Sequence, residues 1–158
     1  MRFRSVFPYT APMKLSTLYQ SRLLELNRTP LNHGSLDAAT HSARGQDALC
    51  GDDLVIELAL DEGGTIINAM WHGQACAITS ASASLLTEWI VDRNVGAVQA
   101  GFHQFEQMLT DPGVAITDDL GEISMLAAVA HYPSRVKNAL LPWKTTLDAL
   151  TAAVDSAV

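Results

Sequence analysis

The stretch 54-LVIELALDEGGTIINAMW-71 contains two apolar, β-branched runs that are separated by a glycine-bearing turn. Residues 54–60 and 65–71 are therefore predicted to be strands, with the turn at residues 61–64. A connection this short joins antiparallel neighbours, because parallel strands need a crossover of about a dozen residues or more. The stretch predicts a β-hairpin, and with it an antiparallel sheet.

Helical periodicity flanks this hairpin on both sides. Residues 31–53 are polar and glycine-bearing, and we expect them to be loop with one short strand near residues 36–43. Pro30 ends the helix on the N-terminal side, and Pro142 is expected to restart the last helix. The predicted helical segments are residues 14–28, 76–92, 94–110, 120–130, a helix that begins near Pro133, and residues 143–154.

These elements predict an α+β fold in which a small antiparallel sheet, of about three strands, packs against several α-helices. The length of 158 residues suits one compact domain, so residues 1–158 are expected to form a single unit. Residues 1–13 hold Pro8 and Pro12 and lack a helical pattern. We expect them to form a loosely ordered N-terminal extension.

Composition excludes several classes of function. The net charge of −7 and the scattered basic residues argue against a nucleic-acid partner. No apolar run reaches the roughly 18 residues that a membrane-spanning helix needs, and the N-terminus lacks the continuous apolar centre of a secretory signal. A cytoplasmic protein without a membrane partner is expected. In that compartment Cys50 and Cys76 are expected to serve thiol chemistry or to be buried, rather than to form a disulfide.

Both cysteines stand in places that suit chemistry. In Cys50-Gly51-Asp52 a thiolate and a carboxylate can turn toward one cation, and zinc accepts this mixture of donors. The alternative is an ordinary solvated loop, since carboxylates are common in loops. Cys76 lies where a predicted strand gives way to a helix, and the free N–H groups of a helix start stabilise a thiolate. The alternative for Cys76 is burial as a small apolar residue.

Four further patterns occur in order along the chain, between residues of about 19 and 150. They are Tyr19–Leu36, with its Pro30-Leu-Asn-His-Gly34 turn, Cys50-Gly-Asp52, Gly73–Ser84 and Pro133–Trp143. In this order they resemble motifs of the SufU/IscU (NifU-like) family of iron–sulfur assembly proteins, and the long stretch after the second cysteine is closer to SufU than to IscU. The resemblance implies a NifU/IscU-like fold.

The resemblance also implies a metal site. In the family, two cysteines, an aspartate and a third cysteine hold a zinc ion or a nascent cluster. The corresponding residues here are Cys50, Asp52, Cys76 and, in place of the third cysteine, Asn138. An amide oxygen is a weaker ligand than a thiolate, so we expect Asn138 to be a weak or absent ligand. Water or His131 would then be a substitute.

The basic residues Arg135 and Lys137 belong to the last motif. The resemblance implies that they lie beside the site, where positive charge would favour thiolates and steer an anionic persulfide. The alternative is that both are solvated helix residues. His72, directly after the second predicted strand, has a small claim as a ligand, similar to that of His131.

The resemblance implies a sulfur acceptor or scaffold that works with a cysteine desulfurase of the SufS/IscS type and with other iron–sulfur assembly proteins. Cys50 would accept the persulfide, zinc would organise the site, and iron or an iron–sulfur cluster would bind transiently. By itself such a chain would not be a turnover enzyme. One alternative is a regulatory or structural relative that binds no metal. Another is a cysteine-dependent enzyme with Cys76 as nucleophile and His72 or His131 as base.

Overall fold

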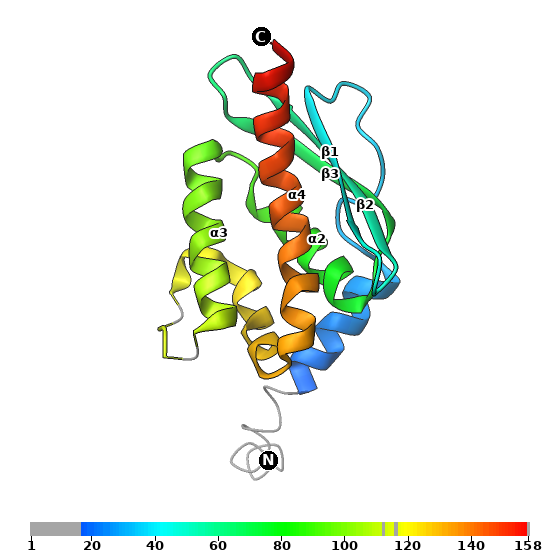
Figure 1. The fold of residues 1–158 in the computed structure, drawn as a ribbon, viewed down its shortest axis with the longest axis vertical. Coiled ribbons are helices and arrows are strands. Elements are labelled where there is room, and N and C mark those ends of the chain that lie inside the picture. The colour runs from blue at the N-terminus through cyan, green and yellow to red at the C-terminus, as the bar shows by residue number, and fades with distance from the viewer. Residues whose placement is uncertain (1–16, 112, 116, 158) are drawn as a thin grey trace, which may run out of the picture.

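The computed structural model describes residues 17–111, 113–115 and 117–157, and Figure 1 shows their arrangement. Three strands form one antiparallel sheet in the order β1-β2-β3, with helices packed against it, so the predicted α+β class is confirmed. The expected extension at residues 1–13 and the first residues of the helix predicted at 14–28 lie outside the described residues. The elements are an N-terminal helix (residues 17–28), β1 (His41–Asp47), β2 (Asp52–Leu60), β3 (Ile66–Gln74), α2 (Ala77–Trp89), α3 (Val95–Thr110), the 3₁₀ helix η1 (Asp118–His131) and α4 (Pro133–Ala157).

The predicted hairpin is confirmed as β2 and β3, and both strands are longer than the apolar runs suggested. The side chains of Leu54, Ile56 and Leu58 alternate along β2 and are fully buried, as one face of a covered sheet requires. The turn is closed by the Asp61 N–H, which donates to the Thr65 carbonyl at 2.9 Å. The β2–β3 pair forms the centre and one edge of the sheet.

The first strand was predicted at the wrong place. It runs from His41 to Asp47 rather than near residues 36–43. Its sequence, HSARGQD, carries little local preference for a strand, so its pairing with β2 and its cover by α4 decide its position. At Gly45 the helix comes so close that an added Cβ would lie 2.0 Å from the Thr145 Oγ1.

The predicted restart at Pro142 is also wrong, because α4 runs unbroken from Pro133 to Ala157. A proline in a helix has no N–H for the carbonyl four residues earlier, which here belongs to Asn138. The Thr79 Oγ1 of α2 lies 3.2 Å from that carbonyl oxygen, so the carbonyl that Pro142 frees faces a hydroxyl group. The contact joins α2 to α4 at the height of the candidate site.

Helices cover one side of the sheet. Figure 1 shows α4 lying along the sheet, and α3 packs on the side of α4 that faces away from the sheet. The N-terminal helix lies near the lower end of the molecule. Aromatic rings centre this layer on the fully buried Trp143, whose ring centroid lies 5.3 Å from that of Phe105 and 5.4 Å from that of Trp89. Among the described helices, none has both the length and the apolar character needed to cross a membrane.

Candidate functional site

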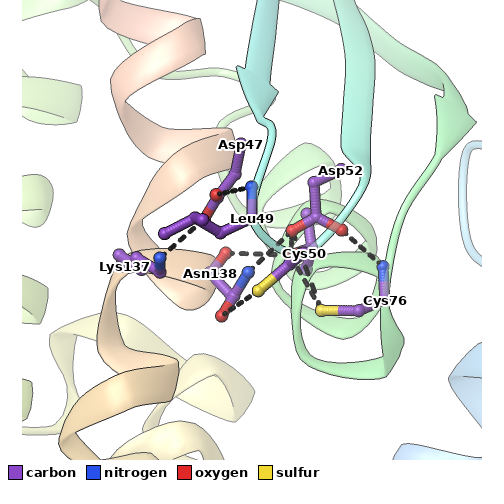
Figure 2. Close-up of polar contacts among 8 residues, drawn as sticks. Asp47, Leu49, Cys50, Asp52, Cys76, Lys137 and Asn138 are labelled. Atoms are coloured by element: carbon purple, nitrogen blue, oxygen red, sulfur yellow. Dashed lines mark hydrogen bonds and ion pairs between the residues drawn. The ribbon is translucent and has the colours of Figure 1, made fainter.

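Strand register brings distant parts of the chain to one end of the sheet. Asp47 pairs with Asp52 across β1 and β2, so residues 48–51 form the loop that carries Cys50. Asp53 pairs with Gln74 of β3, and the chain then turns into α2, with Cys76 as its N-cap residue. Asn138 reaches the same place from α4 (Figure 2).

Asp52 lies at the centre of this site, where it contacts Cys76, Thr79 and Asn138, and it is only 2% exposed. Its Oδ1 accepts a hydrogen bond from the Cys76 N–H at 2.7 Å. Its Oδ2 accepts from the Asn138 Nδ2 at 2.8 Å and from the Thr79 hydroxyl at 2.5 Å, and the Cys76 Sγ lies 3.7 Å from the same oxygen. A carboxylate offers about four lone-pair positions, two on each oxygen, so these contacts saturate Oδ2 and leave Oδ1 with one backbone donor.

Asn138 lies between Asp52 and Cys50, and its side chain is fully buried. Its amide nitrogen faces the carboxylate, and its Oδ1 lies 3.7 Å from the Cys50 Sγ (Figure 2). The reverse orientation would set the amide oxygen against a carboxylate oxygen, so the hydrogen-bond network selects this one. Gly51, with a φ of 74°, makes the turn that leaves Cys50 at the surface and Asp52 inside.

Cys76 is half-buried at the start of α2. Its Sγ lies 3.3 Å from the Thr79 Oγ1 and faces the network around Asp52. Cys76 also lines a cavity of about 360 Å³, together with Ile78, Tyr132 and Arg135. The residue is therefore reachable from outside, beside a cationic side chain.

Lys137, His131 and His72 make their contacts outside the network around Asp52. The Lys137 Nζ is 3.5 Å from the Asp47 Oδ2, and the Asp47 Oδ1 accepts from the Leu49 N–H at 3.0 Å, so this pair holds the base of the Cys50 loop. His131 lines a separate cavity of about 870 Å³ between the N-terminal helix and η1. The His72 Nε2 lies 3.9 Å from the Glu57 Oε1 on the neighbouring strand.

Two residues of the site were not anticipated from the sequence. Thr79 follows the N-cap cysteine by three residues, a spacing that turns its side chain back toward the first turn of α2. That spacing was the available signal. Asp47 forms the cross-strand pair opposite Asp52, and a correct position for β1 would have revealed it.

The donor set does not fit a closed zinc site. Zinc in structural sites takes four ligands, and the sequence offers Cys50, Asp52 and Cys76 with Asn138. Within the part of the chain that the structure describes, no three His, Cys, Asp or Glu side chains are arranged to hold a metal ion. The Asp52 oxygens are engaged by protein donors, and Asn138 turns an NH₂ group, which has no lone pair to offer, toward that carboxylate.

Comparisons with known proteins agree with the sequence motifs. Residues 18–139 match the family described as the NifU-like N terminal domain. An iron–sulfur cluster assembly scaffold protein IscU of Thermotoga maritima is 29% identical over 138 residues, which cover 87% of this chain and 96% of that protein. A zinc-dependent sulfurtransferase SufU of Bacillus subtilis is 30% identical over 130 residues, which cover 82% of this chain and 87% of the relative.

Solved structures agree on the fold. An iron–sulfur cluster assembly scaffold protein for the SUF system of Fervidobacterium islandicum superposes with a TM-score of 0.72 at 27% identity, covering 82% of this chain and 93% of its own. A NifU-like N-terminal domain of Brucella abortus reaches a TM-score of 0.76 at 20% identity over 87% of this chain and 94% of its own, and shares the fold. The three-stranded sheet with its helical layer is therefore the architecture of these proteins.

Proposed function

Because the chain belongs to the family of NifU-like N-terminal domains, we propose that it serves iron–sulfur cluster assembly as a sulfur acceptor, with Cys50 as the accepting thiol. The proposal is supported by relatives named as scaffold proteins and as a sulfurtransferase. One observation carries the choice of residue: Cys50 is exposed on a loop, and its Sγ lies beside a buried polar network. The partner is a cysteine desulfurase that carries a persulfide.

Sulfur transfer to Cys50 is a thiol exchange. The exposed Cys50 thiol loses its proton to water, and the resulting thiolate attacks the outer sulfur of the partner's persulfide, forming a new S–S bond at Cys50. The S–S bond on the partner breaks, and the partner's cysteine leaves as a thiolate with the electron pair. The loop exposes Cys50 for this approach, and the neighbouring Leu49, which is 86% exposed, offers apolar surface next to it. Other iron–sulfur assembly proteins would then take the sulfur onward.

Durable storage of a cluster is not part of the proposal. Iron–sulfur clusters are held mostly by four thiolates, and this site offers Cys50 and Cys76. Iron and sulfide are therefore cargo that passes through. A resident zinc ion, which the resemblance implies, would need the Asp52 carboxylate oxygens, which already accept hydrogen bonds from Cys76, Thr79 and Asn138. We further propose that the protein acts in the cytoplasm, where thiols stay reduced, and that Arg135, beside Cys76, steers the anionic persulfide.

The assignment of Cys50 is tested by persulfide formation. The protein is incubated with a cysteine desulfurase and cysteine, its thiols are alkylated, and added sulfur is located by mass spectrometry. Cys50→Ala is expected to lose the modification, because the exposed acceptor is gone. Cys76→Ala is the matched control and is expected to keep it, because its thiol is half-buried beside Asp52. Equal labelling of Cys50→Ala would remove Cys50 from its role.

A second candidate function is a regulatory relative that binds the desulfurase without taking its sulfur. The amide at position 138, in place of the family's third thiolate, favours it. The same incubation separates the two. A stable complex with the desulfurase, combined with unmodified Cys50 and Cys76, would support the regulatory role and contradict sulfur acceptance.

A further inference from the structure

We infer that the Asn138 carboxamide replaces a metal ion at the centre of this site, so that Cys50 is positioned, and accepts sulfur, without a resident metal. The part about sulfur rests on the proposed function, whereas the part about the metal stands alone. Asn138 is fully buried between the two groups that a metal would otherwise join. Its role is that of a positioning residue.

The carboxamide joins its neighbours by complementary hydrogen bonds. Its NH₂ group donates to the Asp52 Oδ2 at 2.8 Å, and its oxygen lies 3.7 Å from the Cys50 Sγ, so that the thiol can donate to it. One neutral group therefore satisfies a buried carboxylate and holds a thiol. A metal ion would join the same carboxylate and sulfur by coordination, but it would also require the thiol to lose its proton.

A cysteine at position 138 would favour a metal ion over hydrogen bonding at the centre of the site. Its sulfur would lie near Asp52 and Cys50, and these groups could all be negatively charged together only with a cation to offset their repulsion, as in a metal site. Asparagine adds no charge and supplies the N–H donor that Asp52 otherwise lacks on that side. The amide thus makes a cation unnecessary for the geometry of the site.

The backbone around Asn138 is fixed by α2. The Thr79 Oγ1 lies 3.2 Å from the Asn138 carbonyl, which Pro142 leaves without a helical donor. The Ser82 hydroxyl donates to the next carbonyl, that of Ala139, at 2.6 Å. These two contacts hold this turn of α4 against α2, so the carboxamide is presented to Asp52 in a set direction.

Metal content tests the inference directly. Protein purified without added metal and without a chelator is analysed for zinc, and a portion that has been stripped with EDTA and then freed of it is used to measure zinc affinity by competition with a chromogenic chelator. The original protein is expected to hold far less than one zinc per chain. Asn138→Cys is expected to bind zinc at least about 100-fold more tightly, because it supplies the missing thiolate. Asn68→Cys, on an exposed position of β3, is the matched control and is expected to leave zinc affinity unchanged.

Persulfide formation in EDTA supplies the second readout. The original protein is expected to be modified at the same rate with and without the chelator, whereas Asn138→Ala is expected to be modified more slowly in both conditions. Tight zinc in the original protein, or loss of its modification in EDTA, would overturn the inference. If no variant accepts sulfur under any condition, the proposed function fails, while zinc content still decides whether the amide replaces the metal.

Discussion

At the scale of single residues, the Thr79 hydroxyl is, after the Asp52 carboxylate, the group with the most polar contacts to the rest of the site. Its oxygen lies 2.5 Å from the Asp52 Oδ2, 3.2 Å from the Asn138 carbonyl and 3.3 Å from the Cys76 Sγ. The hydroxyl has a single proton, and the shorter distance assigns it to the Asp52 carboxylate, with the Asn138 carbonyl as the weaker, more distant acceptor. A fully buried hydroxyl with this many polar neighbours is costly to remove.

Thr79→Val keeps the shape of the side chain and deletes the hydroxyl. We expect the free energy of unfolding to fall by about 1–3 kcal/mol, because a buried carboxylate loses a donor. Thr79→Ser keeps the hydroxyl and should lose less. Thr110→Val is the control, since that exposed hydroxyl bonds only to its own helix, at the Glu106 carbonyl, and should change stability by no more than about 0.5 kcal/mol. Urea denaturation measures all three, and equal losses for Thr79→Val and Thr110→Val would contradict this account.

Sequence motifs located the candidate residues of the site but not the contacts between them. Cys50, Asp52, Cys76 and Asn138 follow from short motifs, and the resemblance predicts that Asn138 stands where the family has a third cysteine. The direction of the Asn138 amide is not, because it depends on which atoms surround it in three dimensions. The role of Thr79 was hidden for the same reason, since a threonine inside an apolar helix usually bonds to its own backbone.

At the scale of elements, prediction succeeded where the sequence pattern is local and failed where tertiary contacts decide. The β2–β3 hairpin and α2 carry apolar periodicity and turn residues, and both were predicted to within a few residues. β1 has no such pattern, and its position follows from pairing with β2 and from contact with α4. Pro142 predicted a break because a local rule cannot know that Thr79 lies beside the freed carbonyl.

The contact between β1 and α4 gives a prediction at this scale. Gly45→Ala would place a methyl group 2.0 Å from the Thr145 Oγ1, so β1 and α4 must separate. We expect a loss of about 1–3 kcal/mol of unfolding free energy, typical of an overpacked contact. Thr145→Ala removes the closest atom, so the double variant should lose less than the sum of the two single variants.

Gly63→Ala serves as the control for the loss of glycine itself. Its added Cβ would approach no atom closer than the Asp61 Oδ1 at 3.5 Å, so its stability should change by no more than about 0.5 kcal/mol. Chemical denaturation of the four variants gives the coupling energy. Strict additivity between Gly45→Ala and Thr145→Ala would contradict a direct steric contact between the strand and the helix.

At the scale of the whole molecule, the N-terminal helix is joined to η1 and to the start of α2, where the Asn27 Nδ2 donates to the Ala77 carbonyl at 3.2 Å. Arg22 pairs with Glu122 of η1 at the surface, an ion pair that contributes little by itself. Tyr19 lies deeper, in the walls of both the cavity beside Cys76 and the larger cavity beside His131. The docking of this helix therefore shapes the approach to Cys76.

Tyr19 makes this docking sensitive to alkaline pH. Burial raises the pKa of the Tyr19 phenol above its ordinary value, and the nearby Tyr132 raises it further. The folded protein thus favours the neutral phenol, while the unfolded chain ionises near pH 10. The contribution of the neutral Tyr19 phenol to stability is complete below about pH 10, where Tyr19 is also neutral in the unfolded chain. It is lost as the pH rises through the higher pKa of Tyr19 in the folded protein. We expect Tyr19→Phe to weaken the fall in urea midpoint between pH 9 and pH 11, about a unit on either side of that value.

Tyr132→Phe separates the two causes of the shift. Removal of the Tyr132 hydroxyl takes away the neighbouring charge that opposes ionisation of Tyr19. In an absorbance titration of tyrosinate, the last transition should then move to lower pH without disappearing. An unchanged titration in Tyr132→Phe, or an equal alkaline loss of stability in Tyr19→Phe and the original protein, would show that the N-terminal helix is not held by a neutral Tyr19.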